Sequence, residues 1–446
     1  MMPKKTSLLS RFTFALVEIS LYSFLLESTL LPVASFTTTT TLLYTSGKTD
    51  IVGFPVASTL SFSYRRSQTC RASAESAGNQ QQTGEVPLEN FRQMVSSSIV
   101  APTSMPVDRS TLTLLEHVNL NVPSQEYVLP FYFDLLGCGM DPRKAENLAP
   151  DAPKKTLWAN CGASQFHLPY GATPQRIPGH IGLRYDSLDG LRSRLVEQTA
   201  LRDANKKNED EDTKDPIVRD VAMGVDFRTG HEYIKLVDHY DNVFYCRAGG
   251  SVVDFRWQQP FIRASETNAW DNVATRFGMD ETDCRGLDYI EFKCPRGTAE
   301  KIALFYDSVL DATTSVITDD EGHNPTQVAI IAFGHIQANG KADQSLIFRE
   351  TDETLPPYDG HHVAMYIGEN AADFDQAFKN AKLANVVWVN PRFSDKADTL
   401  EGARHWKQFR FKNIVDMETG ETIFELEHEM RSIEHEAWPG PPLATS

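Results

Sequence analysis

Cysteine is scarce in this sequence, with six residues among 446. The six are dispersed along the chain: Cys70, Cys138, Cys161, Cys246, Cys284 and Cys294. No two of them form a C-x-x-C pair, and their density is far below that of small disulfide-stapled proteins. The sequence therefore excludes a zinc ribbon and a disulfide scaffold.

Long basic clusters are also absent. Asp and Glu number 60 against 43 Lys and Arg, which gives a formal net charge of −17. Because nucleic-acid binding requires clustered Lys and Arg, this balance argues against a nucleic-acid partner. The motifs G-x-G-x-x-G, P-loop, G-x-S-x-G and H-E-x-x-H are missing as well, so a nucleotide cofactor, a serine hydrolase and a zincin have no support.

No long uncharged hydrophobic run is present either. The apolar stretch FTFALVEISLYSFLL (12–26) contains Glu18, is followed by Glu27, and is preceded by Lys4, Lys5 and Arg11. A membrane span needs about 20 largely uncharged residues. The stretch is instead typical of the apolar region of a signal peptide, and no membrane association is expected of the mature protein.

A Thr/Ser-rich, acid-poor segment follows this stretch. Residues 1–72 carry seven basic and three acidic side chains, so about +4 of formal charge lies here and about −21 on the remainder. Small residues at Ala34 and Ser35 precede Phe36. A signal peptide followed by a transit-like segment resembles the bipartite presequence of plastid proteins in algae with secondary plastids. We expect plastid import; the alternative is a secreted protein.

Internal repetition organises the rest of the chain. Segments 114–137 and 286–312 read alike, each an alternating strand, a Pro-containing turn and an amphipathic helix; 178–198 and 360–383 form a second similar pair. In the helix expected after Pro295, apolar residues follow the helical spacing: Ile302, Phe305, Tyr306, Val309 and Leu310. Pro130 should kink or delay the helix of the first segment. Short strands follow each helix, so the sequence predicts four βαβββ units in the order A, B, A′, B′.

Alternation along the first strand of each unit separates an apolar face from a polar one. The polar face begins with His117, His180 and His362 in three of the units, and with Tyr289 in the remaining one. His361, next to His362, points to the opposite face. Polar residues recurring at one strand position indicate a cleft with a shared chemical role.

The strings EHVNLNV, FYFDLLG, PGHIGLRYD and IVDMETGETIFELEHE resemble the vicinal oxygen chelate superfamily of glyoxalase I, bleomycin and fosfomycin resistance proteins and extradiol dioxygenases. The resemblance covers about 110–430 and implies an α+β fold in which four βαβββ modules form two paired, half-barrel clefts. The domains expected on this basis are 1–72 (signal plus transit presequence), 73–109 (disordered linker), 110–262 (first module pair), 263–283 (linker), 284–432 (second module pair) and 433–446 (tail).

The family places metal ligands on the first and last strands of paired units. In the first pair this implies His117, His167, His180 and Tyr245, although a tyrosine stands where the family usually has glutamate. In the second pair the donors are His362 and Glu425, with Tyr289 and Ile347 at the other two positions. Either set could hold a divalent metal such as Zn, Ni, Fe or Mn. Glu427 and Glu429 share the face of Glu425 but have the pattern of a solvated strand end.

Polar residues near these positions are candidates for substrate binding. They are Gln165, Arg184, Arg247 and Tyr289. The two arginines could bind an anionic group bidentately, or they could pair with the abundant acids of the same chain.

Two functions remain in competition. The first is a divalent-metal-dependent lyase, isomerase or ring-cleaving dioxygenase acting on a small molecule with vicinal oxygens. The second is a non-catalytic small-molecule-binding or scaffold protein with degenerate metal sites. The catalytic residues, the substrate and the oligomeric state are not determined by the sequence.

Overall fold

The computed structural model describes residues 64–65, 109–149, 152, 155–205, 216–226, 230–248, 283–319, 325–337 and 340–438. The expected presequence (apart from 64–65), the linker 73–108, the acidic segment 206–215, most of the linker 263–283 and the tail beyond 438 lie outside the described residues. Within the described chain, no helix is long and apolar enough to cross a membrane.

In the described residues sixteen strands form two mixed sheets, and the predicted α+β class is confirmed. The nine-stranded sheet has the order β1 (Tyr64–Arg65), β11 (Thr314–Asp319), β12 (Thr326–Ile336), β13 (Ala342–Thr351), β10 (Cys284–Pro295), β6 (Gly179–Tyr185), β9 (Val243–Ala248), β8 (Glu232–Asp238), β7 (Val218–Val225). The seven-stranded sheet has the order β15 (Gln408–Val415), β16 (Thr422–Ser432), β14 (His362–Ile367), β2 (Leu112–Asn119), β5 (Ser164–Leu168), β4 (Leu157–Cys161), β3 (Gly139–Met140).

Helices separate the first strand of each segment from the strands that follow it. They are α2 (Gln125–Val128) with the π-helical η1 (Leu129–Leu135), α3 (Asp189–Asn205), α5 (Ala299–Leu310) and α6 (Ala371–Leu383), with the 3₁₀ turn η2 (Pro142–Leu148) and α7 (Leu400–Trp406) in addition. The order β-α-β-β-β occurs in 112–168, 179–248 and 284–351. The segment 362–432 has two strands after its helices and an isolated bridge between Val387 and Phe411.

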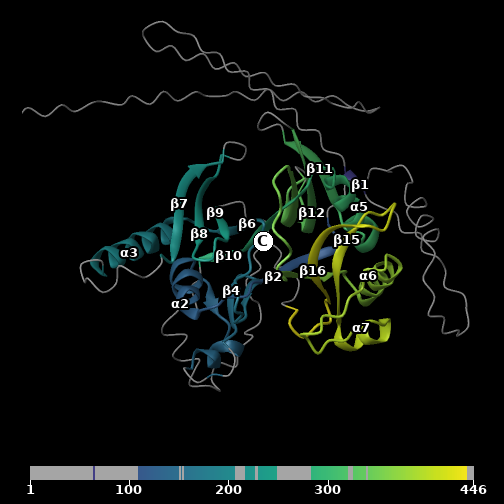
Figure 1. The fold of residues 1–446 in the computed structure, drawn as a ribbon, viewed down its shortest axis with the longest axis horizontal. Helices are drawn as coiled ribbons and strands as arrows, with labels where there is room; N and C mark the ends of the chain where they lie inside the picture. The colour runs from purple at the N-terminus through teal and green to yellow at the C-terminus, as the bar shows by residue number, and fades with distance from the viewer. Residues whose placement is uncertain are drawn as a thin grey trace, which may run out of the picture. The chain divides into compact units, whose positions relative to one another are not determined.

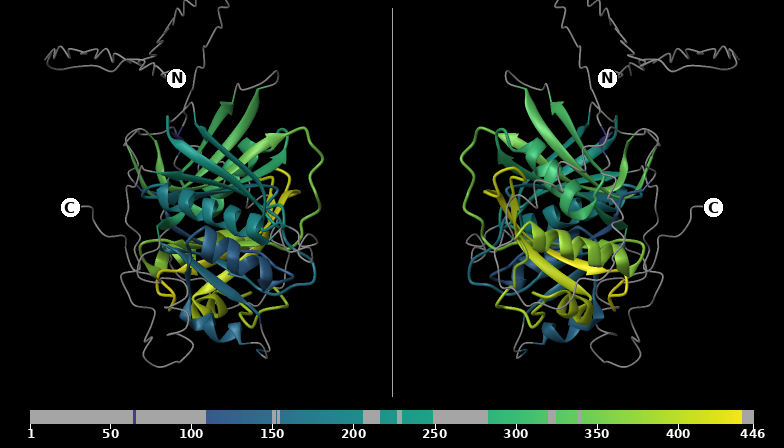
Figure 2. Two further views of the ribbon diagram at one scale, coloured as in Figure 1. Left: turned by 90° about the vertical axis from the view of Figure 1, so that its left-hand side faces the viewer. Right: turned by 90° about the vertical axis from the view of Figure 1, so that its right-hand side faces the viewer.

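The helices cover the apolar faces of the sheets. Figure 1 shows α6 and α7 beside β15 and β16, and the views in Figure 2 show α5 next to α6. The expected apolar stripe of α5 is buried, as are Phe374 and Phe378 of α6. Pro130 lies in η1, where the helix leaves α-helical hydrogen bonding. Proline has no N–H to donate, so the helix is expected to kink or begin late here. The wider π-helical turn is the form that this irregularity takes.

The sheets do not pair the segments that are neighbours in sequence. The first strand of each segment is parallel to its last strand, and the central contacts are the antiparallel pairs β2–β14 and β6–β10. The first segment therefore shares a sheet with the fourth, and the second with the third. This corrects the expected grouping into 110–262 and 284–432. Sequence could not settle it, because all four first strands have the same alternation and each can offer its free edge to any other.

Strand β2 contains a β-bulge at Glu116. Ala364 of β14 lies opposite His117, whereas the next residue, Met365, lies opposite Leu115. Glu116 is therefore an extra residue in the ladder. A bulge of this kind redirects side chains that strict alternation would send to opposite faces, and here it brings Glu116 next to the ring of His117.

A tight contact joins the two sheets at the β4–β5 turn. Gly162 has a φ of +55°, and a β-carbon built on it would lie 1.9 Å from the carbonyl oxygen of Arg285 in β10. Only glycine fits this position, since any other side chain would add both a left-handed strain and a backbone clash.

We expect Gly162→Ala to lower the free energy of unfolding by more than about 2 kcal/mol. Gly297→Ala is the matched control, because Gly297 also has a positive φ (+78°) but nothing lies within 4 Å of its built β-carbon. Urea unfolding of both variants separates the clash from the backbone strain. Equal losses in the two variants would contradict the assignment.

Candidate metal centre

Two rows of polar side chains cross one face of the seven-stranded sheet. Strand register places Glu429, Ala364, His117 and Gln165 in one row, and Glu427, His362, Asn119 and His167 in the next. Both rows run across the antiparallel pair β2–β14, which joins the first segment to the fourth. Histidines far apart in the sequence therefore come together here.

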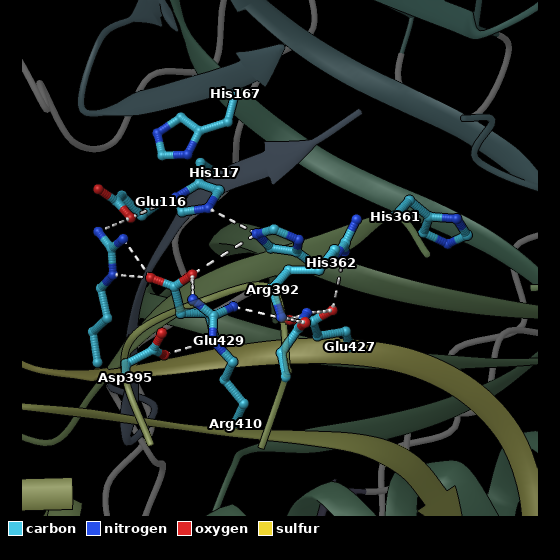
Figure 3. Close-up of polar contacts among 12 residues, drawn as sticks. Glu116, His117, His167, His361, His362, Arg392, Asp395, Arg410, Glu427 and Glu429 are labelled. Carbon is cyan, nitrogen blue, oxygen red and sulfur yellow. Dashed lines mark hydrogen bonds and ion pairs between the residues drawn. The ribbon is translucent and has the colours of Figure 1, made fainter. Parts of the chain in front are cut away.

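His117, His362 and Glu429 form the centre of this face (Figure 3). The Nε2 atoms of the two histidines are 3.4 Å apart, and Nε2 of His362 is 3.8 Å from Oε2 of Glu429. One ligand atom from each residue lies within 4.8 Å of the other two. The three residues are 0%, 2% and 3% exposed, respectively, so the centre is closed off from bulk solvent.

Glu116 fixes the orientation of the His117 ring. Its Oε2 is 2.8 Å from Nδ1 of His117, and the same oxygen accepts from Nη1 of Arg431 at 2.6 Å. A carboxylate acceptor selects the tautomer that carries its proton on Nδ1, so Nε2 keeps its lone pair and points at His362. A carboxylate behind an imidazole is the arrangement that orients histidine ligands in metalloproteins.

Both imidazoles are held in their neutral form. Burial is the largest cause that lowers the pKa of His117 and of His362 well below the usual value, and Arg410 lowers both further. Neutral imidazole nitrogen is the form that binds metal. The site is therefore prepared for a cation without having to lose histidine protons first.

Two guanidinium groups hold Glu429 ionised. Nη2 of Arg410 donates to its Oε2 at 2.5 Å, and Nε of Arg431 donates to its Oε1 at 2.6 Å. Burial alone would raise the pKa of Glu429, but Arg410 and Arg431 outweigh it and hold the pKa well below its ordinary range. Nη2 of Arg431 also contacts Oε1, and each carboxylate oxygen has two lone pairs, so the free lone pair is on Oε2, the oxygen nearer to His362.

Carboxylates outnumber guanidinium groups in the buried network around the centre. Glu116, Asp395, Glu427 and Glu429 are all less than a tenth exposed, against Arg410 and Arg431. The side chain of Arg392, 3.8 Å from Glu427, is half exposed. Burial raises the pKa of Glu427 even though Asn390 and Arg410 donate to it. The network thus has an excess of buried negative charge, which a divalent cation would offset.

The segment 384–399 closes the centre from one side. Asp395 accepts from Nε of Arg410 at 2.7 Å, and the Phe393 ring lies 4.2 Å from the Arg410 guanidinium. The rings of Phe393 and His362 are also nearly perpendicular, with 5.9 Å between their centroids. The segment therefore supplies both charge and an apolar wall to the site.

The donor set fits a divalent metal. Two nitrogen atoms bound to a tetrahedral zinc at about 2.0–2.1 Å would be about 3.3–3.4 Å apart, which matches the separation of the histidine Nε2 atoms. Two histidines and one carboxylate are also the donors of metal sites that leave positions open for other ligands.

His167 lies beside the centre but outside this group of three. Its ring stacks on His117 at 3.7 Å and on Trp158 at 4.3 Å, and its Nε2 bonds Oε1 of Gln165 at 2.9 Å. Nε2 of Gln165 also donates to Asp141 and Asn160. His167, predicted as a ligand, stacks on the His117 ring, and Gln165, predicted for substrate binding, holds His167 in turn.

The other predicted ligands of the first pair lie in the other sheet. His180 and Tyr289 stand at the register positions that correspond to His117 and His362, and Tyr245 and Ile347 at those that correspond to His167 and Glu429. The His180 ring is 4.8 Å from that of Tyr245, and its Nδ1 is 3.7 Å from Glu291. The expected set of His117, His167, His180 and Tyr245 is therefore divided between two sheets, because the first segment pairs with the fourth and the second with the third.

The two arginines predicted for substrate binding pair with acids of the same chain. Arg184 and Arg247 both contact the buried carboxylate of Asp288, at 2.7 Å for Arg247, and Arg184 also donates to the carbonyl of Asp343. The Arg247 guanidinium lies 4.8 Å from the ring of Tyr289. Of the two roles considered for these arginines, anion binding or an internal ion pair, the contacts are those of internal ion pairs.

Glu425 is not at the centre. It pairs with Lys412 at 2.7 Å and lines a cavity of about 730 Å³ with Tyr358 and His361. Glu427 and Glu429, expected to be solvated, are 1% and 3% exposed. The string ELEHE presents three glutamates on one face, and only the strand register decides which of them reaches the histidines. His361 points away from the centre, as predicted, but it is buried against Phe292.

No protein-family model matches the chain, and no curated protein matches it. Among solved structures, glyoxalase I from Zea mays is similar at 11% identity and a TM-score of 0.42, covering 72% of this chain and 93% of its own. The fosfomycin resistance protein FosX from Listeria monocytogenes matches at 15% identity and a TM-score of 0.21, covering 31% of this chain and 93% of its own. A variant of 4-hydroxymandelate synthase from Streptomyces coelicolor matches at 14% and 0.24, covering 73% and 93%.

Residues after β16 pack at the edge of the same network. Trp438 lies 4.7 Å from the Tyr366 ring, and Nδ1 of His435 accepts from the N–H of Ala437 at 3.1 Å. Burial, followed by Arg431, lowers the pKa of His435 to about 4; Glu116, Glu429 and Glu436 oppose this effect. The neutral ring of His435 therefore stabilises the packing of the residues that follow β16.

We expect the free energy of unfolding to fall as the pH falls from about 6.5 towards 4. In this range His435 takes up a proton in the unfolded chain but stays neutral in the folded protein. The contribution is about 1–2 kcal/mol after screening by solvent. His435→Gln keeps an acceptor for Ala437 but does not titrate, so its unfolding free energy should depend less on pH in this range. Identical pH profiles of the two proteins, measured by urea unfolding, would remove His435 as the cause.

Proposed function

We propose that the protein is a divalent-metal-dependent enzyme of the lyase, isomerase or ring-cleaving dioxygenase type, acting on a small molecule with two adjacent oxygens. The convergence of His117, His362 and Glu429 carries the proposal. The carboxylate behind His117 and the excess of buried negative charge support it independently.

A metal held by these residues would act as a Lewis acid towards adjacent substrate oxygens. The protein's own groups prepare the site for that role. Glu116 holds the ring of His117, Arg410 and Arg431 keep Glu429 ionised, and the Phe393 ring packs against His362. Zinc, nickel, iron and manganese all suit a donor set of this type.

Metal binding tests the proposal directly. We expect full-length protein to bind one divalent ion, and His117→Ala and His362→Ala to reduce bound metal to background. Glu116→Gln should weaken affinity about 10–100-fold, because it removes the carboxylate that orients a ligand. Elemental analysis after dialysis and competition with a chromogenic chelator provide the measurements.

His405→Ala is the matched control, since His405 is an exposed histidine outside the centre. It should keep its metal content. Circular dichroism of each variant shows whether a loss of metal reflects a loss of fold. Equal, negligible metal in the parent protein and the two centre variants would sink the proposal.

A second candidate is a non-catalytic binding or scaffold protein. The specific observation in its favour is that both oxygens of Glu429 already carry charge-assisted hydrogen bonds, so the network is satisfied in part without a cation. Metal-dependent turnover in a glyoxalase or catechol-cleavage assay would decide for the enzyme. A metal-free protein without such turnover would favour the binding protein.

We also propose that the chain is imported into a plastid, on the composition of residues 1–72. A fluorescent protein fused to residues 1–75 should accumulate in the plastid of an alga with a secondary plastid. Its appearance in the medium would instead favour the secreted alternative.

A further inference from the structure

The cavity of about 730 Å³ that Glu425 lines is bordered by two connections between the sheets. Residues 169–178 lead from β5 of the seven-stranded sheet to β6 of the nine-stranded sheet, and residues 352–361 lead back from β13 to β14. Both connections line the cavity, and β15 and β16 supply most of the remaining wall. Its volume is in the range of small-molecule sites, roughly 300–1,000 Å³. The cavity is separate from the metal centre, whose three donors are not part of its wall.

Asp359 fixes the two connections against each other. Its Oδ2 accepts from the N–H of Arg176 at 2.7 Å, and its carbonyl accepts from Nε2 of Gln175 at 2.8 Å. Its Oδ1 accepts from the N–H of His361 at 3.1 Å and lies 2.6 Å from Nδ1 of the same residue. The wall is therefore held in place before a ligand arrives, which lowers the entropic cost of binding.

Rigid, flat groups make up much of the wall. Prolines from three separate segments line it, namely Pro178, Pro295 and Pro356, together with the rings of Tyr358 and Phe424. Proline and aromatic rings present flat apolar surfaces and lose little conformational freedom when a ligand packs against them. Such a wall suits a planar apolar molecule.

The charged side chains of the wall are paired within the chain. Lys412 contacts Glu425 at 2.7 Å, and Arg176 contacts Asp241 at 2.6 Å. The carboxylate of Asp359 is taken up by the contacts that join the two connections. The charges of the described wall therefore favour a neutral ligand over an ionic one.

His361 and Asn413 each place a buried polar atom in this wall without a hydrogen-bond partner among the described residues. The two atoms are Nε2 of His361, a residue that is 3% exposed, and Oδ1 of Asn413. Figure 3 shows the His361 ring turned away from His362. The carboxylate of Asp359 selects the tautomer with its proton on Nδ1, so Nε2 of the neutral ring is an acceptor. Because a buried acceptor without a partner costs free energy, a ligand that brings hydrogen-bond donors is favoured.

We propose that this cavity is a binding site for a neutral planar molecule that carries hydroxyl groups, of the phenol class. The ring system packs against the prolines and Tyr358, and the hydroxyl groups donate to Nε2 of His361 and Oδ1 of Asn413. Binding here uses none of the donors of the metal centre, so the site does not depend on the proposed metal-dependent reaction.

Isothermal titration calorimetry of the full-length protein tests the proposal. The probe is a dihydroxynaphthalene with one hydroxyl group on each ring, and its dimethyl ether is the comparison, since the ether has the same rings but cannot donate. We expect the diol to bind at one site and at least about tenfold more tightly than the ether, because each hydrogen bond contributes about two- to tenfold. Protein treated with a chelator should bind the diol equally well, which separates this site from the metal centre.

Two variants locate the binding. His361→Phe and Asn413→Leu each remove one acceptor at similar size, and each should weaken diol binding about two- to tenfold while leaving the ether unchanged. Thr422→Val is the matched control, because Thr422 lines the same cavity and is exposed. It should bind both compounds as the parent protein does.

The comparison of the diol with its ether in the parent protein does not depend on the folding of any variant. Equal affinities of the parent for the two compounds would overturn the proposal, as would the failure of both to bind at their solubility limits. Diol binding of unchanged affinity in both His361→Phe and Asn413→Leu would overturn it as well.

Discussion

The antiparallel pairing of β2 with β14 is the contact on which the rest of the site depends. It joins the first and the fourth segments of the chain and places His117 and His362 on adjacent strands, one diagonal step apart. The bulge at Glu116 sits in this same pair. Without it, Glu116 would point to the opposite face and the His117 ring would lose the carboxylate that orients it.

Around this pair the protein buries an unusual amount of charge. Arg410 bridges Asp395, Glu427 and Glu429, and Arg431 bridges Glu429 and Glu116. Buried ion pairs of this kind cost much desolvation energy and seldom contribute net stability. Such a network is better explained by the position it gives to Glu429 between two neutral histidines than by the stability of the fold.

The two sheets show how one architecture carries two different surfaces. The register of β6 with β10 repeats that of β2 with β14, so His180 and Tyr289 are the counterparts of the two centre histidines. Tyr289 and Ile347 stand where the other sheet has the donors His362 and Glu429, and the Arg247 guanidinium lies over the Tyr289 ring. The strand geometry is thus shared, while the chemistry at each centre is set by a few side chains.

Local pattern was sufficient for the α+β class, for the burial of the α5 stripe and for the polar faces that begin with His117 and His362. These features depend on residues close together in sequence, through the periods of strand and helix. The fold partners of the segments, the choice of Glu429 over Glu425 and the bulge at Glu116 do not. They depend on which strands pair at their free edges and on the register of that pairing. A strand's own sequence specifies neither.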